Sequence, residues 1–431
     1  MLPSILICSI TCIIMILSVL FFPKIKLGKI SLDTYWIVTL IGVIILLASG
    51  QVNLKSVGNA LIANNAINPL KILVLFISMT LLSIFLDELG FFRHLAGIVL
   101  KRANKGQLKL FIYLYILVSI LTIFTSNDII ILSFTPFICY FAKNAKIDPT
   151  PYLAAEFVAA NTWSILLIIG NPTNIYLASA YGIDFLSYIK YSILPTLFAG
   201  LVSFIIMFIL FRNKLKAPIE GEAEEFEIKD KVSLWVGIIH LGICTLFLAI
   251  SSYVGIEMWI VSIIAVGSLC ISSIIISIVR KEKPQYLVGC LKRLPYQLVP
   301  FVLSMFIMII ALSDKGVTNA IGNLLGEKLP ILTYGLTSFL SANLINNIPM
   351  SVLFSSIISS SNVGLGGIFA TIVGSNLGAI FTPIGALAGL MWSKILNEHN
   401  IKFGYLDFLK IGVIVTLPSL FAALGGLFIL L

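Results

Sequence analysis

Residues 125–136 read TSNDIIILSFTP, and residues 343–349 read NLINNIP. Each polar turn separates two apolar stretches that are short for membrane crossings. These stretches are 108–125, 129–142, 331–342 and 347–360. Polar turns of this kind are typical of re-entrant hairpins, because irregular backbone at membrane depth persists only where protein or a cavity surrounds it. The two turns predict a membrane protein with two re-entrant hairpins.

The composition of the chain agrees with a membrane location. Of its 431 residues, 59% are hydrophobic and 11% are charged, and the mean hydropathy is +1.08. A soluble domain is typically about 25% charged. These values exclude a soluble enzyme, a disordered chain and a nucleic-acid-binding protein. Six scattered cysteines lack paired metal-ligand spacing, so we expect neither a disulfide framework nor a metal centre.

Long apolar segments recur along the whole chain. A helix needs about 20 apolar residues to cross the hydrocarbon core of a bilayer. Residues 2–22 lack a basic residue after Met1 and a small-residue cleavage site before Pro23, so we expect a retained helix rather than a signal peptide. The predicted crossings are 2–22, 34–50, 70–86, 151–180, 190–211, 233–252, 258–279, 295–313, 367–395 and 410–431.

The basic residues indicate how these segments are oriented. If each hairpin enters and leaves on one side, the proposed cytoplasmic loops hold 23 Lys and Arg and the outer loops hold 5. Cytoplasmic loops of membrane proteins carry an excess of Lys and Arg. The net charge of +9 therefore indicates a topology with both termini outside, rather than an acidic partner.

The order of the predicted elements repeats. Residues 34–211 and 258–431 each run through crossings, a hairpin, a broken helix and a last crossing, from opposite sides of the membrane. Such inverted-topology repeats are common in secondary transporters. Residues 1–33 form an N-terminal helix, and 212–257 form an acidic cytoplasmic linker plus a connecting helix. The linker acids are Glu220, Glu222, Glu224, Glu225 and Glu227.

Two predicted crossings are interrupted. Helix 151–180 contains GNPTN at 170–174, and helix 367–395 contains GSN at 374–376 and TPIG at 382–385. Proline frees a carbonyl one turn earlier, and glycine lets backbones approach closely. In transporters, half-helix N-termini face anionic groups and unwound carbonyls bind cations. The hairpin tips and helix breaks predict a midplane site for a small solute and a coupling ion.

The candidate site residues lie on these four elements. They could instead only join helices through polar contacts and kinks, but four elements in matched positions of two halves favour a site. The candidates are Ser126, Asn127, Asp128, Gly170, Asn171, Thr173, Asn174, Asn343, Asn346, Asn347, Gly374, Ser375, Asn376, Thr382 and Gly385.

Few carboxylates fall within the apolar segments. Asp128 at the first hairpin tip is a candidate cation ligand or proton carrier, because intramembrane carboxylates mark ion pathways. Its alternative role is to cap the returning half-helix. Glu156 is placed either within the core or at the cytoplasmic interface, since Asp148 precedes it by only two helical turns.

The hairpin segment 125–136 resembles the first-hairpin signature of the ion transporter superfamily. This superfamily includes arsenite/antimonite permeases, citrate-transporter-like proteins and divalent anion:sodium symporters. The stretches DELGFF at 87–92 and GSNLGAIFTPIGALAGLMW at 374–392 are similar to the permeases, whereas GNPTN at 170–174 is more similar to the symporters. The resemblance covers residues 34–431 in the same order.

The resemblance implies a scaffold domain and a transport domain that moves as an elevator, often within a homodimer. The transport domain would hold both hairpins and both broken helices. The symporters bind sodium at the corresponding Ser-Asn tip and broken helix, which implies a sodium site at Ser126, Asn127, Gly170 and Asn174. No cofactor other than a coupling sodium ion or proton is expected.

Three features depart from the permeases: Asn161, Asn376 and the pair Ala379-Ile380. The permeases carry an acid at the positions of Asn161 and Asn376, and a Pro-Lys pair at Ala379-Ile380. The second hairpin tip, Asn346-Asn-Ile-Pro349, follows the permease pattern rather than the symporters' Ser-Asn-Thr. The absence of both acids counts against proton-coupled arsenite exchange.

The sequence therefore predicts a secondary active transporter of a small anion or oxyacid, coupled to sodium or protons, in a bacterial plasma membrane. The alternatives are an arsenite/antimonite efflux permease, a sodium/proton antiporter that depends on Asp128, and a passive channel suggested by Asn171-Pro-Thr. No enzymatic constellation of His, Ser or paired carboxylates is present in the apolar segments. The expected partners are the solute, the lipid bilayer and a second copy of the chain, not nucleic acid.

Overall fold

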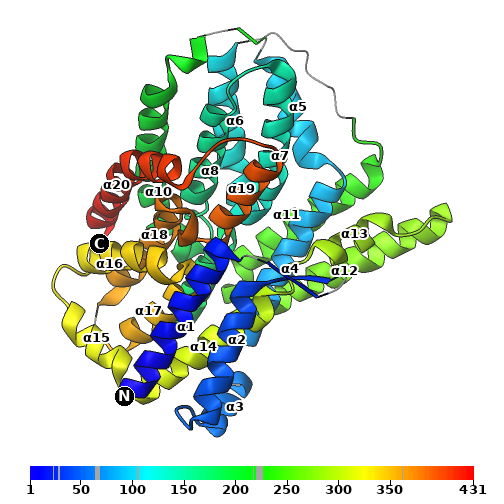
Figure 1. Ribbon diagram of the computed structural model, residues 1–431. Helices are drawn as coiled ribbons and strands as arrows, with labels where there is room; N and C mark the ends of the chain where they lie inside the picture. Colours follow the sequence, from blue (N-terminus) through cyan, green and yellow to red (C-terminus); the bar gives the residue numbers. More distant parts are fainter. Residues whose placement is uncertain are drawn as a thin grey trace.

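α-Helices make up almost all of the fold, and one short β-hairpin lies near the N-terminus (Figure 1). The computed structural model describes residues 1–22, 24–27, 30–63, 68–103, 106–216, 218–219, 227–361 and 363–431. Four glutamates of the predicted acidic linker, Glu220, Glu222, Glu224 and Glu225, lie outside these residues.

The first ten helices precede the predicted linker. They are α1 (Leu2–Phe21), α2 (Thr34–Ala48), α3 (Leu54–Ile62), α4 (Pro69–Glu88), α5 (Phe91–Arg102), α6 (Gln107–Phe124), α7 (Asn127–Ala145), α8 (Thr150–Trp163), α9 (Pro172–Ala180) and α10 (Phe185–Phe211). The antiparallel strands β1 (Lys24–Leu27) and β2 (Ile30–Asp33), which were not predicted, join α1 to α2. The short 3-10 turns η1 (Ile168–Gly170) and η2 (Lys214–Lys216) complete this part.

The remaining ten helices follow the linker. They are α11 (Lys231–Val254), α12 (Met258–Arg280), α13 (Gln285–Arg293), α14 (Leu298–Asp314), α15 (Val317–Leu325), α16 (Pro330–Ile345), α17 (Asn347–Ser359), α18 (Gly364–Phe381), α19 (Leu387–Glu398) and α20 (Tyr405–Leu430). The 3-10 turn η3 (Pro383–Gly385) separates α18 from α19.

The helices expose apolar surface as membrane helices do. In the described part of the chain, nine helical segments are long and apolar enough to cross a membrane. Helix α12 presents Ile264, Ile271, Ile275 and Ile278 along one exposed side. Soluble proteins rarely leave such apolar strips uncovered. The chain is therefore an all-α polytopic membrane protein.

The element order of α2–α10 recurs in α12–α20. Each series contains a first helix, a short helix, a long helix, a second short helix, a helical hairpin, a broken helix and a final long helix. The second short helices, α5 and α15, start after Gly90 and Gly316, which adopt left-handed φ angles of 78° and 72°. Glycine adopts such angles at no steric cost. The fold therefore contains the predicted inverted repeats, although these short helices were not predicted.

Each hairpin packs against the broken helix of its own half. The arms α6 and α7 both contact α8, and the arms α16 and α17 both contact α18. In Figure 1, α6–α8 lie together in the upper part of the molecule and α16–α18 in the lower left. Both predicted hairpins are present, with turns at Thr125–Ser126 and at Asn346. Each tip thereby meets a helix that is itself broken.

The two helix breaks differ in detail from the prediction. Helix α8 ends at Trp163, well before the GNPTN motif, and Asn171 caps the start of α9. The predicted interruption at Gly374–Asn376 is wrong, because these residues lie inside the continuous helix α18. A Cβ atom at Gly374 would collide with Ser338 Oγ and the Gly335 carbonyl oxygen. This glycine allows α18 to pack closely on α16, and the break occurs at Thr382–Ala386 instead.

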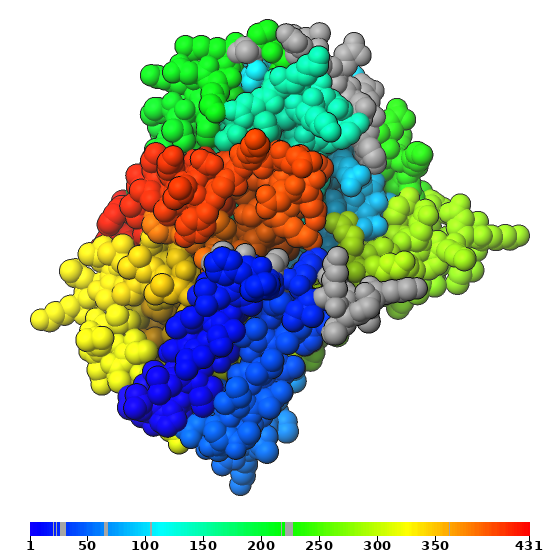
Figure 2. All heavy atoms as spheres, viewed as in Figure 1, coloured from blue at the N-terminus to red at the C-terminus, as the bar shows by residue number. Residues whose placement is uncertain are grey.

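Helices α8 and α18 form the centre of the molecule. Residues 151–162 of α8 and 367–380 of α18 are all buried. Figure 2 shows the N-terminal segment (blue) on the outside of the molecule, beside the C-terminal part of the chain (orange to red). The central helices each end at a helix break, so unwound backbone lies in the protein interior.

Candidate functional site

Asn376 joins the two halves of the protein at its centre. Its Nδ2 donates a hydrogen bond to Asn174 Oδ1 at 2.7 Å, and its Oδ1 accepts one from Ser164 Oγ at 2.9 Å. Asn376 lies on α18, Asn174 on α9 and Ser164 just after α8. All three residues are fully buried. These two hydrogen bonds therefore connect α18 of the second half to the broken helix α8–α9 of the first half.

The first hairpin tip extends this contact. Asn127 Nδ2 donates to Asn161 Oδ1 at 3.0 Å, and the Asn161 carbonyl oxygen accepts from Ser164 Oγ, also at 3.0 Å. Asn161 Nδ2 donates to the Phe157 carbonyl oxygen one turn earlier. We call Asn127, Asn161, Ser164, Asn174 and Asn376 the amide network.

Side-chain hydrogen bonds stabilise the unwound backbone of the first helix break. Asn174 Nδ2 donates to the backbone carbonyl oxygens of Ser164 at 2.7 Å and Leu167 at 3.2 Å. The Leu167 carbonyl oxygen also accepts from the Gly170 N–H group at 3.1 Å. Ser192 Oγ of α10 donates to the Leu166 carbonyl oxygen at 2.8 Å. A Cβ atom at Gly170 would collide with the Ser164 carbonyl oxygen, so the turn needs glycine there. The sequence pattern thus builds a fixed unwound segment.

Several polar atoms around the amide network have no partner. Ser126 Oγ, Asn127 Oδ1, Asn171 Nδ2 and Ser375 Oγ are buried without a hydrogen bond to any described residue. A buried polar group left unpaired costs about 1–3 kcal/mol. Such groups in a native structure are usually satisfied by water, an ion or a bound solute. These four unpartnered atoms make the surroundings of the amide network the candidate site for a polar solute or ion.

A second polar cluster lies at the break of the other half. Asn343 Nδ2 donates to the Gly378 carbonyl oxygen at 3.0 Å, and Thr382 Oγ1 donates to Asn343 Oδ1 at 2.6 Å. Asn346 Nδ2 donates to the Ile384 carbonyl oxygen at 3.1 Å. Gly385 packs so closely that a Cβ atom would lie 2.5 Å from the Gly378 carbonyl oxygen. The second hairpin tip is thereby attached to the second break, as the first tip is to the first.

Half-helix N-termini surround this region. Helices α7 and α17 begin at Asn127 and Asn347, the two hairpin tips, and α9 begins at Pro172. The Asn171 side chain accepts from Thr173 N and Thr173 Oγ1, which caps α9. The free N–H groups of a helix N-terminus carry a partial positive charge. The region can therefore attract an anionic or oxygen-rich solute without a basic side chain.

The structure separates the sequence-predicted candidates into groups. Asn127, Asn174 and Asn376 meet in the amide network, whereas Asn343, Asn346, Thr382 and Gly385 meet in the second cluster. Asn347 is buried at the start of α17, and Gly374 packs against α16. Asp128 lies beside the first tip but is partly exposed, and it takes no part in the amide network.

Ser164 of the amide network was not predicted. It lies in the apolar stretch WSILLII, where no motif distinguishes a functional serine from a packed one. Its spacing of three residues after Asn161, on one helical face, is the signal that could have identified it.

Glu156, whose depth the sequence left open, is fully buried. Its Oε1 accepts from Thr135 Oγ1 at 2.8 Å, and its Oε2 accepts from Trp392 Nε1 at 3.3 Å. The carboxylate is therefore a core group between α7, α8 and α19.

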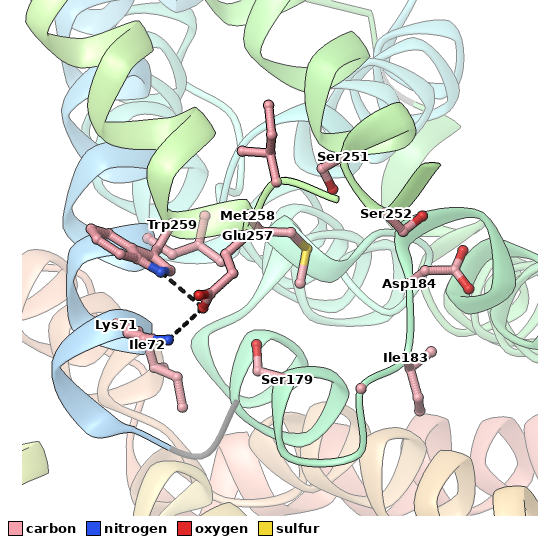
Figure 3. Close-up of a pocket in the computed structure, with 13 residues that line it drawn as sticks. Lys71, Ile72, Ser179, Ile183, Asp184, Ser251, Ser252, Glu257, Met258 and Trp259 are labelled. Atoms are coloured by element: carbon pink, nitrogen blue, oxygen red, sulfur yellow. Dashed lines mark hydrogen bonds and ion pairs between the residues drawn. The ribbon is translucent and has the colours of Figure 1, made fainter. Parts of the chain in front are cut away.

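A cavity of about 180 Å³ opens elsewhere, between α4, the α9–α10 turn and the α11–α12 turn (Figure 3). At its wall, Glu257 Oε2 accepts from Lys71 Nζ at 2.6 Å and from Trp259 Nε1 at 3.0 Å. The hydrogen bond from Lys71 lowers the pKa of the Glu257 carboxyl below its ordinary value. None of the sequence-predicted site residues lines this cavity.

Curated relatives of the chain are bacterial membrane proteins. An Escherichia coli arsenical pump membrane protein is 30% identical over 379 residues, which cover 82% of this chain and 84% of that protein. A second Escherichia coli protein of the same name is 28% identical over 436 residues, or 96% of each chain. With its apolar helices, the chain is a multi-pass protein of the bacterial plasma membrane.

A solved structure and a family model also match. The crystal structure of the Alcanivorax borkumensis YdaH transporter, described as having an unusual topology, is similar with a TM-score of 0.57 at 14% identity. The match covers 99% of this chain and 98% of that chain, and at this identity it concerns the fold alone. The model of the citrate transporter family, CitMHS, matches residues 30–372. The chain therefore belongs to the citrate transporter family.

Proposed function

We propose that this protein is a secondary active transporter of a small oxyacid, and that arsenite is the first substrate to test. The observation that carries the proposal is the amide network, where unpartnered buried polar atoms lie at the contact between the two halves. A site of this kind transports a solute rather than transforming it, because it contains amides and hydroxyls but no nucleophile beside a base.

The chemistry of the network favours a neutral or weakly charged oxyacid. Arsenite in neutral water is an uncharged trihydroxide, and its hydroxyls can both donate and accept hydrogen bonds. Asn127 Oδ1 and Ser126 Oγ can accept such bonds, and Asn171 Nδ2 can donate one. The names of the Escherichia coli relatives point to the same class of solute.

Citrate is the second candidate, because the family model bears its name. A tricarboxylate would need several positive groups for its charges. The residues of the amide network are all uncharged, so only half-helix N-termini could compensate. A singly charged anion fits this arrangement better than a trianion.

The proposed coupling ion is sodium or a proton. Ser126 Oγ and Asn127 Oδ1 are oxygen atoms of the kind that sodium binds, and both are buried and unpartnered. Asn174 Oδ1 accepts a hydrogen bond from Asn376 Nδ2. It could bind sodium only if this hydrogen bond lengthened. We also propose an elevator-type movement, in which hairpins and broken helices move together against the remaining helices. Its support is the packing of each hairpin on its own broken helix.

Uptake by proteoliposomes tests the proposal. Purified protein should take up labelled arsenite, antimonite or a small monoanion when a sodium or pH gradient is imposed. Asn127→Ala should abolish this uptake, whereas Asn397→Ala, at an exposed position of α19, should leave it unchanged. Failure of the unaltered protein to move any of these solutes under either gradient would refute the proposal.

A further inference from the structure

The Glu156 side chain lies where helices α7, α8 and α19 meet. It lies on α8, five residues before Asn161, which corresponds to about 7–8 Å along a helix axis. Thr135 reaches it from α7, the returning arm of the first hairpin, and Trp392 reaches it from α19 of the other half. The carboxyl group therefore contacts a hairpin and both broken helices.

The surroundings of Glu156 are apolar apart from these two donors. The Trp392 ring packs against Phe157, Phe403 and Phe408, with ring centroids 5.1, 5.1 and 5.6 Å away. The Trp392 and Glu156 side chains are themselves buried. An ionised carboxylate in such a place is strongly disfavoured unless a cation pairs with it.

No basic group compensates this charge in the described part of the chain. The ion pairs formed by the described residues do not include Glu156. The titratable neighbour on α7 is the Cys139 thiol, which is not a basic group.

Among the described residues, no basic side chain of the other packed helices forms a hydrogen bond or ion pair with Glu156, whose partners are Thr135 and Trp392. On α19, Lys394 pairs with Glu398 at the surface. Helix α18 has no titratable side chain. The Tyr115 hydroxyl of α6 bonds to α10, at the Gly200 carbonyl oxygen and Ser203. On α8 itself, the Tyr152 hydroxyl bonds to Gln107.

Thr135 can satisfy both charge states of the carboxyl group. A hydroxyl group donates to an ionised carboxylate and accepts from a protonated carboxyl. Thr135 Oγ1 lies 2.8 Å from Oε1 and 3.1 Å from Oε2, close enough for either arrangement. The contact therefore allows a proton to bind and leave without losing the hydrogen bond.

We propose that Glu156 is the proton-binding site through which transport is coupled to a pH gradient. This inference rests on the proposed transport function. Glu156 lies between the cytoplasmic start of α8 and the amide network, so its charge acts on the hairpin and broken helices that hold the solute. It lies on the same helix as Asn161, the residue of the amide network that contacts the first hairpin tip.

The decisive experiment compares gradient-driven uptake with exchange. Wild-type protein and the Glu156→Gln variant are placed in proteoliposomes, and labelled arsenite is followed with and without a pH gradient. In a second assay, labelled arsenite exchanges against unlabelled arsenite at equal pH, which requires no net proton movement. We expect Glu156→Gln to lose the acceleration by the gradient and to keep the exchange.

Glu398→Gln serves as a matched control, because it removes a carboxylate of α19 that pairs with Lys394 at the surface. This variant should retain the acceleration by the pH gradient. The inference is overturned if a pH gradient also accelerates arsenite uptake by Glu156→Gln. It is likewise overturned if wild-type uptake depends on a sodium gradient and not on a pH gradient. In both cases the proposed transport function still stands. If the wild-type protein transports no solute under any gradient, the proposed transport function itself is refuted.

Infrared difference spectroscopy covers the case in which Glu156→Gln does not fold. A proton-binding carboxyl gives a C=O band that disappears when the wild-type protein is brought to high pH. Thr135→Val should shift the frequency of this band, because it removes the hydrogen bond. A band that does not respond to pH, or that is unaffected by Thr135→Val, would overturn the inference.

Discussion

Asn376 illustrates at the residue scale how one amide connects two halves of a protein. Its side chain is the partner of both Ser164 and Asn174, so its removal leaves Asn174 Oδ1 unpaired and takes one acceptor from Ser164 Oγ, which keeps its bond to the Asn161 backbone carbonyl oxygen. Unpaired buried groups cost about 1–3 kcal/mol each. The same side chain thus affects the stability of the junction and the proposed site.

We predict that Asn376→Ala lowers the free energy of unfolding by about 1–3 kcal/mol and strongly reduces uptake. Thermal unfolding of the purified protein measures the first effect, and uptake by proteoliposomes measures the second. The exposed Asn397 provides the control, since Asn397→Ala removes an amide that faces solvent. Equal unfolding temperatures for the two variants would contradict a junction held by Asn376.

Glu257 gives a prediction about pH. Its hydrogen bond with Lys71 lowers the pKa of the folded-state carboxyl below the ordinary value of 4.5. Because the folded pKa is depressed, the stabilisation is present above the ordinary pKa and is lost as pH falls through the folded pKa. The Glu257 side chain is 47% exposed, so solvent screens the pair and we expect it to contribute at most about 1 kcal/mol.

Glu257→Gln should therefore lower the unfolding temperature slightly at pH 7 and have no effect at a pH well below 4.5. Unfolding curves of both proteins across this range measure the difference. High salt should reduce the difference at pH 7 as well, because it screens exposed charges. A difference that grows on acidification would show that the sign is wrong.

At the scale of elements, the helix breaks show which signals a sequence carries. Proline and the polar residues beside it located both breaks, since proline cannot continue the hydrogen-bond ladder of a helix. Glycine was ambiguous: Gly170 lies in a break, whereas Gly374 lies within a continuous helix. Whether glycine serves a turn or a close helix contact depends on the neighbouring element, which the local sequence does not reveal.

The contact between α16 and α18 gives a prediction at this scale. Gly374→Val should destabilise the protein by about 1–3 kcal/mol or more, because overpacking displaces backbone and side chains. Gly425→Ala on α20 is the control, since no atom lies within 4 Å of the added Cβ. Thermal unfolding of both variants distinguishes them. A tolerated valine at position 374 would disprove the close packing.

The short helices α3, α5, α13 and α15 were missed for a related reason. They have 9 to 12 residues, too few to cross a membrane and barely enough to form helices alone. They are stable because one face packs on longer helices, as α5 does on α6 and α7. Their positions therefore depend on tertiary contacts.

At the scale of the whole molecule, the orientation in the membrane can be tested directly. We predict that a cysteine introduced at Ser361 reacts with an impermeant thiol reagent added to intact cells, and that one at Asn397 does not. The excess of basic residues in the proposed cytoplasmic loops is the physical reason. The unaltered chain, with its six native cysteines, gives the background. If only the cysteine introduced at Asn397 were labelled, the predicted orientation in the membrane would be wrong.

The sequence by itself determined the membrane class, the two hairpins and the order of the repeats, and it placed the breaks near Pro172 and Pro383 without their bounds. These features follow from local rules: apolar length, proline, and polar residues that cannot face lipid. Only the tertiary structure placed Ser164 and Asn376 in one network and buried Glu156 between Thr135 and Trp392. These contacts join residues as much as 236 positions apart, and such pairings depend on how helices pack rather than on local sequence.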